Sequence, residues 1–237
     1  MLAGRRLLQA PPGRRRTFTV QRRDATTTQF SDTASQQPWA TPEAWRRTAE
    51  GHGYLRVRSF QDGMSHRVDV AFADLAATES LIVDLRGNLG GSLVEALAFR
   101  DRFLRQPLPM GTVRYSTGEG GLSAPFPITA EPSERRRWTR RVRFLTDPLT
   151  CSASEDALLG LQGLAHVQVM GLPSGGGSGR PRSIRLLPGT RLSVSTALTY
   201  DRTGHCIEGA GIPVDVAVNW YGQPPLDQVP AEATRAW

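Results

Sequence analysis

The sequence contains no lysine, and all 29 basic residues of the 237-residue chain are arginine. A side chain that takes a proton from a hydroxyl must be able to stand neutral, whereas a guanidinium stays protonated at any working pH. The absence therefore excludes a lysine of this chain as the base that activates a hydroxyl nucleophile. It also indicates a general compositional bias toward arginine.

Cysteines and long apolar runs are also scarce. Cys151 and Cys206 can form at most one disulfide, and no Cys/His spacing is typical of a metal site, so we expect neither metal nor cofactor. Both cysteines are interpreted as small buried side chains, with a reactive Cys151 beside Ser152 as the alternative. No run approaches the roughly 18–20 apolar residues that span a bilayer, and no signal-peptide pattern begins the chain. As given, the chain is expected to stay in the cytoplasm.

Positive charge is in excess, with a formal net charge of +7 and a pI near 10.5. Such values are compatible with nucleic-acid binding. The densest basic runs, residues 14–16 and 135–137, nevertheless lie in turn-rich segments without interleaved aromatic residues that could stack on bases. We therefore expect no specific nucleic-acid partner.

Predicted strands alternate with predicted helices, which indicates an α/β fold. Residues 80–85 are almost continuously apolar, as expected for a strand covered on both faces. The other predicted strands are 53–60, 142–147, 166–171, 183–187 and 190–198, and the predicted helices are 41–51, 66–77, 92–104 and 152–164. Residues 106–140, rich in proline, glycine and charge, are expected to form a long irregular excursion.

The predicted domain organisation has four parts. Residues 1–24 hold one strand, 25–40 form a polar linker, 41–219 form the core domain, and 220–237 form a loosely held tail. The core is predicted to begin with a helix because threonine, proline and glutamate at 41–43 are typical of a helix start.

Two segments of the core carry candidate chemistry. Residues 150–155 place Ser152 at the start of a predicted helix, and residues 81–91 form a buried strand that ends in Gly90 and Gly91. Acyl transfer needs a nucleophile, a base, and donors aimed at the developing oxyanion. The amide of Ala153 and that of Gly90 or Gly91 could be these donors, because glycine lets the backbone approach a substrate closely.

Each segment alone also has an ordinary structural interpretation. A serine at a helix start is most often an N-cap, and Ser152 with Glu155 fits the capping-box pattern. The glycines of 87–91 fit a structural turn or an anion site, and they match neither the phosphate-loop nor the dinucleotide fingerprint. The joint order of the two segments favours the catalytic interpretation.

In this order the chain resembles the tail-specific, or C-terminal processing, serine peptidases and their relatives, the tricorn core and the interphotoreceptor retinoid-binding protein repeats. The matching segments are residues 53–60, 81–91, 150–155, 169–179 and 207–216. The resemblance implies a crotonase/ClpP-like ββα core that cuts unfolded or extended polypeptides. It makes Ser152 the nucleophile, with Ala153, Gly90 and Gly91 as oxyanion donors. Residues 1–24 resemble the last strand of a PDZ domain.

The chain departs from this family at the base. One branch uses a Ser–Lys dyad, which the absence of lysine excludes. The other branch uses a histidine before the PDZ segment, in a region this chain lacks, and a late glutamate that Glu208 matches. The histidines left as candidates are His52, His66, His166 and His205. We favour His205, because a hydrogen bond to Glu208 within one turn could orient it.

Three hypotheses follow. The first is a serine peptidase that acts through Ser152. The second is a catalytically inactive peptidase-fold module that binds peptide or an apolar ligand. The third is that Met1 is not the true start, and that the full-length protein is an exported enzyme of the histidine type. The sequence does not predict an oligomeric state.

Overall fold

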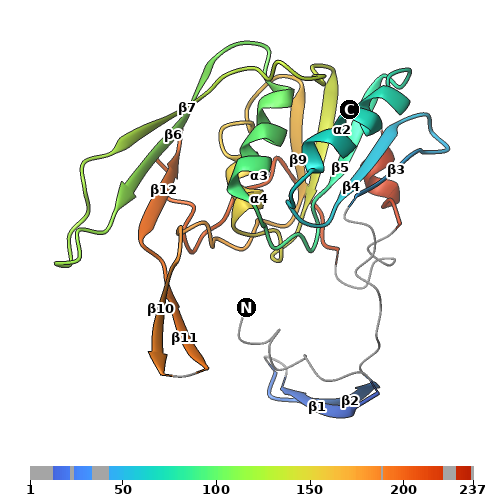
Figure 1. Ribbon diagram of the computed structural model, residues 1–237. Helices are drawn as coiled ribbons and strands as arrows, with labels where there is room; N and C mark the ends of the chain where they lie inside the picture. The colour runs from blue at the N-terminus through green and yellow to red at the C-terminus, as the bar shows by residue number, and fades with distance from the viewer. Residues whose placement is uncertain (1–12, 22–23, 34–42, 188, 221–227, 236–237) are drawn as a thin grey trace. The chain divides into compact units, whose positions relative to one another are not determined.

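The computed structural model describes residues 13–21, 24–33, 43–187, 189–220 and 228–235, and it divides into two compact units, 1–41 and 42–237. In the first unit, strand β1 (Arg15–Gln21) pairs antiparallel with β2 (Thr27–Thr33), and the rings of Phe18 and Phe30 stack with centroids 5.2 Å apart (Figure 1). The strand predicted within 1–24 is confirmed. The linker prediction is wrong for residues 27–33, which form its partner strand.

The second unit is built on a six-stranded sheet of order β13-β9-β8-β5-β4-β3. Its strands are β3 (Glu43–Arg47), β4 (Gly53–Val57), β5 (Ser80–Asp84), β8 (Arg141–Thr146), β9 (Val167–Gly171) and β13 (Val216–Ala217). All neighbours pair parallel except β3 with β4. The predicted α/β class is confirmed, as is the prediction that residues 80–85 hold a strand buried on both faces.

Each face of this sheet has its own cover. Helices α2 (Met64–Asp74), α3 (Leu93–Arg100) and α4 (Ala153–Leu158) lie on one face (Figure 1), and a short 3₁₀ turn, η1 (Asp101–Phe103), follows α3. Side chains alternate along each strand, so Leu81 and Val83 pack with the helices while Ile82 faces the other side. There, Trp220 and the turn η2 (Ala231–Thr234) cover the sheet. The prediction of a loosely held tail is wrong for this part of 220–237.

The first predicted helix of the core is also wrong, because its described residues form the edge strand β3. Trp45 lies opposite Leu55 of β4, packs against the core and donates its indole N–H to Asp74 at 2.8 Å. Thr41 and Pro42, which suggested the helix start, lie outside the described residues. Burial of the tryptophan explains why tertiary pairing overrides the local signal.

The segment 106–140 is not irregular throughout. It holds β6 (Leu108–Tyr115) and β7 (Phe126–Ala130), which join β12 (Ala197–Asp201) in a three-stranded antiparallel sheet of order β12-β6-β7. The predicted strand 190–198 is split between β12 and β11 (Thr190–Val194), and β11 pairs with β10 (Arg182–Leu187) in a hairpin. No helix among the described residues is long and apolar enough to cross a membrane.

Candidate active site

Three loops meet at the carboxyl ends of the parallel strands, where open α/β sheets hold their ligands. They follow β5, β8 and β9, and they contain residues 85–91, 147–152 and 172–179. Thr150 links all three, because its hydroxyl donates to the carbonyl of Leu85 at 2.9 Å and its carbonyl accepts from the amide of Gly175 at 2.8 Å. The two segments that the sequence singled out are therefore neighbours in space.

Ser152 has an unusual backbone, with φ 61° and ψ −128°, immediately before α4. A non-glycine residue in such a region costs about 1–3 kcal/mol and is found mainly at functional sites. The residue is half-buried rather than enclosed. A serine on a sharp strand-to-helix turn is the geometry that presents a nucleophilic hydroxyl above a sheet.

Gly90 lies directly against this turn and Gly91 against Phe60, and the two glycines have φ of 96° and 137°. A Cβ on Gly90 would come within 2.8 Å of both the Ser152 Cβ and the Ala153 amide nitrogen, and one on Gly91 within 2.0 Å of the Phe60 carbonyl oxygen. No side chain is tolerated at either position. Gly90 therefore allows the loop after β5 to approach the serine turn, and Gly91 allows it to approach Phe60.

The amides at this contact differ in their hydrogen bonding. The Gly90 amide donates to the side-chain oxygen of Asn88 at 2.9 Å. Within the described part of the chain, the amides of Ala153 and Gly91 have no acceptor. Two unpaired amides beside the Ser152 turn are what an oxyanion would require, whereas the Gly90 amide is already engaged.

Glu155 joins the serine turn to the glycine loop after β9. The side chain is fully buried, and its carboxylate accepts from the amides of Ser152 at 2.9 Å, Gly176 at 2.7 Å and Gly177 at 2.8 Å, and from the hydroxyl of Ser174 at 2.6 Å. The capping-box pattern predicted only the first of these bonds. The other three donors lie about 20 residues away in sequence, so no local pattern could reveal them.

Asp84 anchors the loop after β5 and had no predicted role. This buried carboxylate accepts from Arg56 at 2.7 Å, from the hydroxyl of Tyr54 at 2.8 Å, and from the Arg86 guanidinium at 2.7 and 2.9 Å. A buried acid needs such partners, and losing one of them is costly. An aspartate at the end of an apolar strand, followed two residues later by arginine, was the available signal.

Glu208 lies at the far end of the glycine loop. Its carboxylate accepts from the Ser195 hydroxyl at 3.1 Å, and a Cβ on Gly179 would lie 2.6 Å from the same oxygen. The other carboxylate oxygen is buried and has no partner among the described residues. Burial raises the pKa of Glu208, because water no longer solvates the charge, and the nearby negative charge of Glu155 adds to the shift.

The structure does not bring His205 to Glu208. The His205 amide donates to Asp201, the last residue of β12, while Glu208 bonds to Ser195, which precedes that strand. The two side chains therefore belong to opposite ends of β12, and His205 is exposed. The predicted hydrogen bond within one turn is wrong, because residues 205–207 extend along β12 instead.

The other histidines also lie away from the serine turn. His52 has both ring nitrogens engaged, with Ser80 at the amino end of β5 and with the carbonyl of Thr234. His166 precedes β9 and bonds to the Phe103 carbonyl, and His66 is exposed on α2. No hydrogen bond joins a histidine to Ser152 in the described ranges.

Cys151 does not compete with Ser152 as a nucleophile. Burial, followed by the charge of Glu155, raises the pKa of the Cys151 thiol to about 11. The raised pKa disfavours the thiolate at neutral pH, which argues against Cys151 as the nucleophile.

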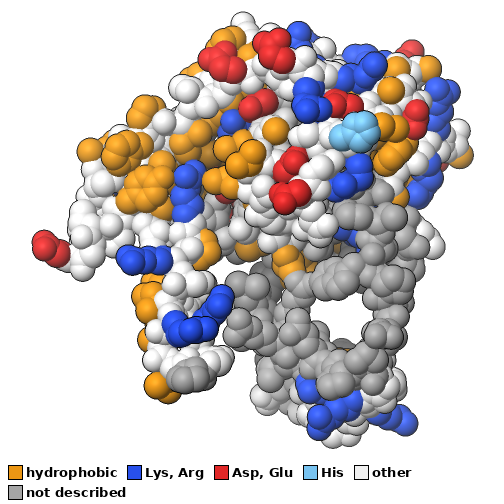
Figure 2. Space-filling model, viewed as in Figure 1, with side chains coloured by type: hydrophobic (Ala, Val, Ile, Leu, Met, Phe, Trp, Pro, Cys, Tyr) orange, Lys and Arg blue, Asp and Glu red, His pale blue; other side chains and the backbone are white. Residues whose placement is uncertain are grey.

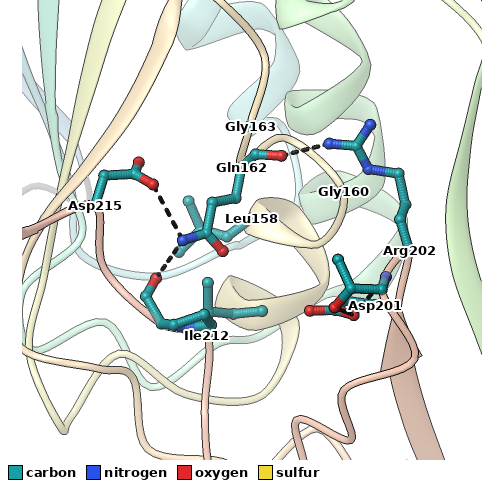
Figure 3. Close-up of a pocket in the computed structure, with 10 residues that line it drawn as sticks. Leu158, Gly160, Gln162, Gly163, Asp201, Arg202, Ile212 and Asp215 are labelled. Carbon is teal, nitrogen blue, oxygen red and sulfur yellow. Dashed lines mark hydrogen bonds between the residues drawn. The ribbon is translucent and has the colours of Figure 1, made fainter.

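A separate cavity of about 490 Å³ lies at the other end of α4 (Figure 3). Leu158 and Ile212 give it apolar walls. Its polar groups satisfy one another, since the Gln162 amide donates to Asp215 at 3.2 Å and Arg202 donates to the Gln162 carbonyl. The length of α4 separates this cavity from Ser152.

Comparison with known proteins agrees with this geometry. Residues 51–218 match the profile of peptidase family S41. The chain belongs to this family. Among curated proteins, it is 28% identical to a carboxy-terminal-processing protease of Bartonella bacilliformis, over 70% of this chain and 38% of that protein. It is 26% identical to a nisin-resistance protein of Lactococcus lactis, over 59% and 46%.

Solved structures of S41 type share the fold. A candidate peptidase from Parabacteroides merdae superposes with a TM-score of 0.69 at 33% identity, over 76% of this chain and 58% of that one. The photosystem II D1 C-terminal processing protease gives 0.64 at 19% identity, over 81% and 52%. This S41 chain spans less than half the length of the curated relatives it matches.

Proposed function

We propose that this S41 chain carries the catalytic centre of a serine peptidase that hydrolyses unfolded or extended polypeptides, with Ser152 as nucleophile. One observation carries the proposal: Gly90 packs against a strained serine turn, and the amides of Ala153 and Gly91 have no acceptor among the described residues. The names of the curated relatives, a carboxy-terminal-processing protease among them, support a polypeptide substrate.

In this reaction the Ser152 oxygen attacks the carbonyl carbon of the scissile peptide bond. The amides of Ala153 and Gly91 then donate to the oxygen that gains negative charge, and each such donor typically contributes a hundred- to a thousandfold in rate. Gly90 contributes close approach, and its amide becomes a donor only if Asn88 releases it. Glu155 accepts from the amides of Ser152 and Gly177, and so ties the serine turn to the glycine loop after β9.

The reaction needs a base, which the described contacts do not identify. Glu208 is proposed to orient that base, because one oxygen of its carboxylate is buried at the end of the glycine loop without a partner among the described residues. His205 would have to leave the β12 edge to reach it. Free imidazole can act as a proton acceptor. If the lack of a base limits the rate, adding imidazole to the reaction should speed up Ser152-dependent cleavage.

The finer architecture is part of the same proposal. The alternation of parallel strands and helices 53–171 supports a crotonase/ClpP-like ββα core. The hairpin of β1 and β2 is proposed to be the remnant of a PDZ domain, supported so far by sequence resemblance alone.

The decisive experiment compares the purified chain with its Ser152→Ala variant on an unfolded protein substrate. We expect mass spectrometry to detect peptides from the parent that are absent with the variant, at a rate at least about a thousandfold above the variant. A folded parent that yields the same products as Ser152→Ala would refute the proposal.

A further inference from the structure

The hairpin formed by β10 and β11, here called the arm, begins and ends at the glycine loop after β9. The glycine loop runs through Arg180 into β10, and β11 leads to Ser195, whose hydroxyl donates to Glu208. The amide of Thr196 closes the base of the arm on the Gly179 carbonyl at 2.8 Å. In Figure 1 the arm extends beyond the end of β12. The base of the arm therefore lies next to Glu208 of the proposed active site.

The arm has one mostly apolar face and one polar face that carries a pair of arginines. Cross-strand pairs place Ile184 opposite Leu192, and Arg185 opposite Arg191. Since side chains alternate along a strand, Ile184, Leu192 and Val194 share a face on which they stay 43–44% exposed, and Arg182, opposite Val194, lies at the base of the same face. The other face holds the two arginines. Figure 2 shows hydrophobic and basic side chains together on the arm.

Among the described residues, neither face of the arm has a partner that packs against it or neutralises its charge. Like charges directly opposite each other destabilise a strand pair, and no ion pair joins Arg185 or Arg191 to a carboxylate of the described residues. A two-stranded hairpin without a packed face is only marginally stable in water. The arm thus lacks both a cover for its apolar face and a counter-charge for its basic face.

A single extended polypeptide can supply both. A strand added to the free edge of β10 or β11 would direct alternate side chains to the two faces. Alternation also places Ser193 and Ser195 on the arginine face, so this face looks to the side where Ser195 meets Glu208. Arginine binds carboxylates through paired, charge-assisted hydrogen bonds, which makes a carboxylate the fitting partner.

We propose that the arm binds a stretch of the polypeptide substrate in which apolar side chains alternate with side-chain carboxylates. This inference rests on the proposed peptidase function, since it names the substrate of the same site. Arg185 and Arg191 determine the charge preference, and Ile184, Leu192 and Val194 determine the apolar one.

Binding is measured in the Ser152→Ala background, so that cleavage does not interfere. The probes are short fluorescein-labelled peptides, amidated at the C-terminus, in which valine alternates with glutamate, glutamine or lysine. By fluorescence anisotropy at low salt, we expect the glutamate peptide to bind at least about tenfold more tightly than the lysine peptide. Replacing valine by serine in the glutamate peptide should weaken binding by a similar factor.

Charge reversal tests whether the arm is responsible. Arg185→Glu with Arg191→Glu should invert the preference, so that the lysine peptide binds better. A gain of that kind cannot come from misfolding. Arg136→Glu with Arg137→Glu, an exposed pair outside the arm, changes the net charge equally and should leave the preference unchanged.

The inference is overturned if the parent binds all the peptides equally, or if the arm reversal leaves the order of their affinities unchanged. It is also overturned if the amidated peptides fail to bind and only a peptide with a free C-terminal carboxylate binds. Cleavage of an unfolded protein with Ser152 intact reports the proposed function separately. If the parent cleaves through Ser152 but shows no preference among the peptides, this inference alone is refuted. If the glutamate peptide is preferred but no cleavage depends on Ser152, the proposed function alone is refuted.

Discussion

At the scale of single residues, a small change at Glu155 should strongly lower the stability of the fold. Glu155→Gln keeps the shape of the side chain but gives it one acceptor oxygen and a donor group, where four donors now point. Because each buried polar group left unpaired costs about 1–3 kcal/mol, we expect the free energy of unfolding to fall by about 2–4 kcal/mol. Denaturant unfolding measures this loss.

The same substitution should lower kcat for peptide hydrolysis by at least about a hundredfold, because the Ser152 amide and the glycine loop after β9 lose the carboxylate that holds them together. Asp156→Asn is the matched control. Asp156 bonds to the Ser178 hydroxyl, and burial raises its pKa, so its charge is not favoured by the fold. A Glu155→Gln variant as stable and as active as Asp156→Asn would contradict the anchoring role.

Glu208 presents the opposite balance between stability and activity. Since burial raises its pKa, the folded state disfavours the ionised form, and stability is lost as pH rises from the ordinary glutamate value toward the folded pKa. Glu208→Gln should therefore raise Tm at neutral pH, with the difference vanishing in acid. The proposed orienting role predicts that it also lowers kcat. Thermal scans at both pH values check the first point, and a variant that melts earlier at neutral pH refutes it.

At the scale of elements, the sequence predicted the strands and helices whose signals are local. The strands β5, β8 and β9 and the helix α2 agree with their apolar patterns to within a few residues. The irregular excursion predicted at 106–140 and the helix predicted at 41–51 show the limits. Trp45 is held in a strand by pairing with β4, and β6 pairs with β12 about 85 residues later, where Gly111 must let the Tyr200 carbonyl pass. Such non-local pairing leaves no periodic signal.

The site follows the same rule. The serine turn and the glycines were predictable because each is a compact motif, and the structure places them in contact. The partners of Glu155 in the loop after β9 and those of Asp84 in β4 are distant in sequence and were missed. The His205–Glu208 pair was predicted from closeness in sequence, but in an extended segment residues three apart cannot share one turn.

A substitution in the edge strand β3 distinguishes the strand seen in the structure from the helix predicted at 41–51. Trp45→Ala removes a partly buried indole and its hydrogen bond to Asp74, so we expect a loss of about 2 kcal/mol in the free energy of unfolding. In an exposed helix, alanine would instead be neutral or stabilising. Chemical denaturation of the parent and the variant decides between these outcomes.

At the scale of the whole molecule, the C-terminal residues connect the open face of the sheet to the catalytic loops. The Trp220 indole donates to the Thr146 carbonyl at 2.7 Å, and the guanidinium of Arg86, in the loop after β5, stacks 5.2 Å from its ring. Arg86 also donates to the Gln228 carbonyl at 3.0 Å. The tail thus holds Arg86, which pairs with Asp84, and through Arg86 it holds the start of the loop after β5.

Trp220→Ala should therefore affect both stability and catalysis. Truncation of a buried tryptophan typically costs about 3–5 kcal/mol, and Trp220 is 8% exposed, so we expect a loss of at least about 3 kcal/mol. Because Arg86 loses its stacking partner, kcat should fall even at temperatures where the variant is fully folded. Val94→Ala, at an exposed position on α3, is the control and should change neither. If Trp220→Ala unfolds with the parent's denaturant midpoint, the tail is not part of the fold, and the domain can be cut after residue 219 without loss.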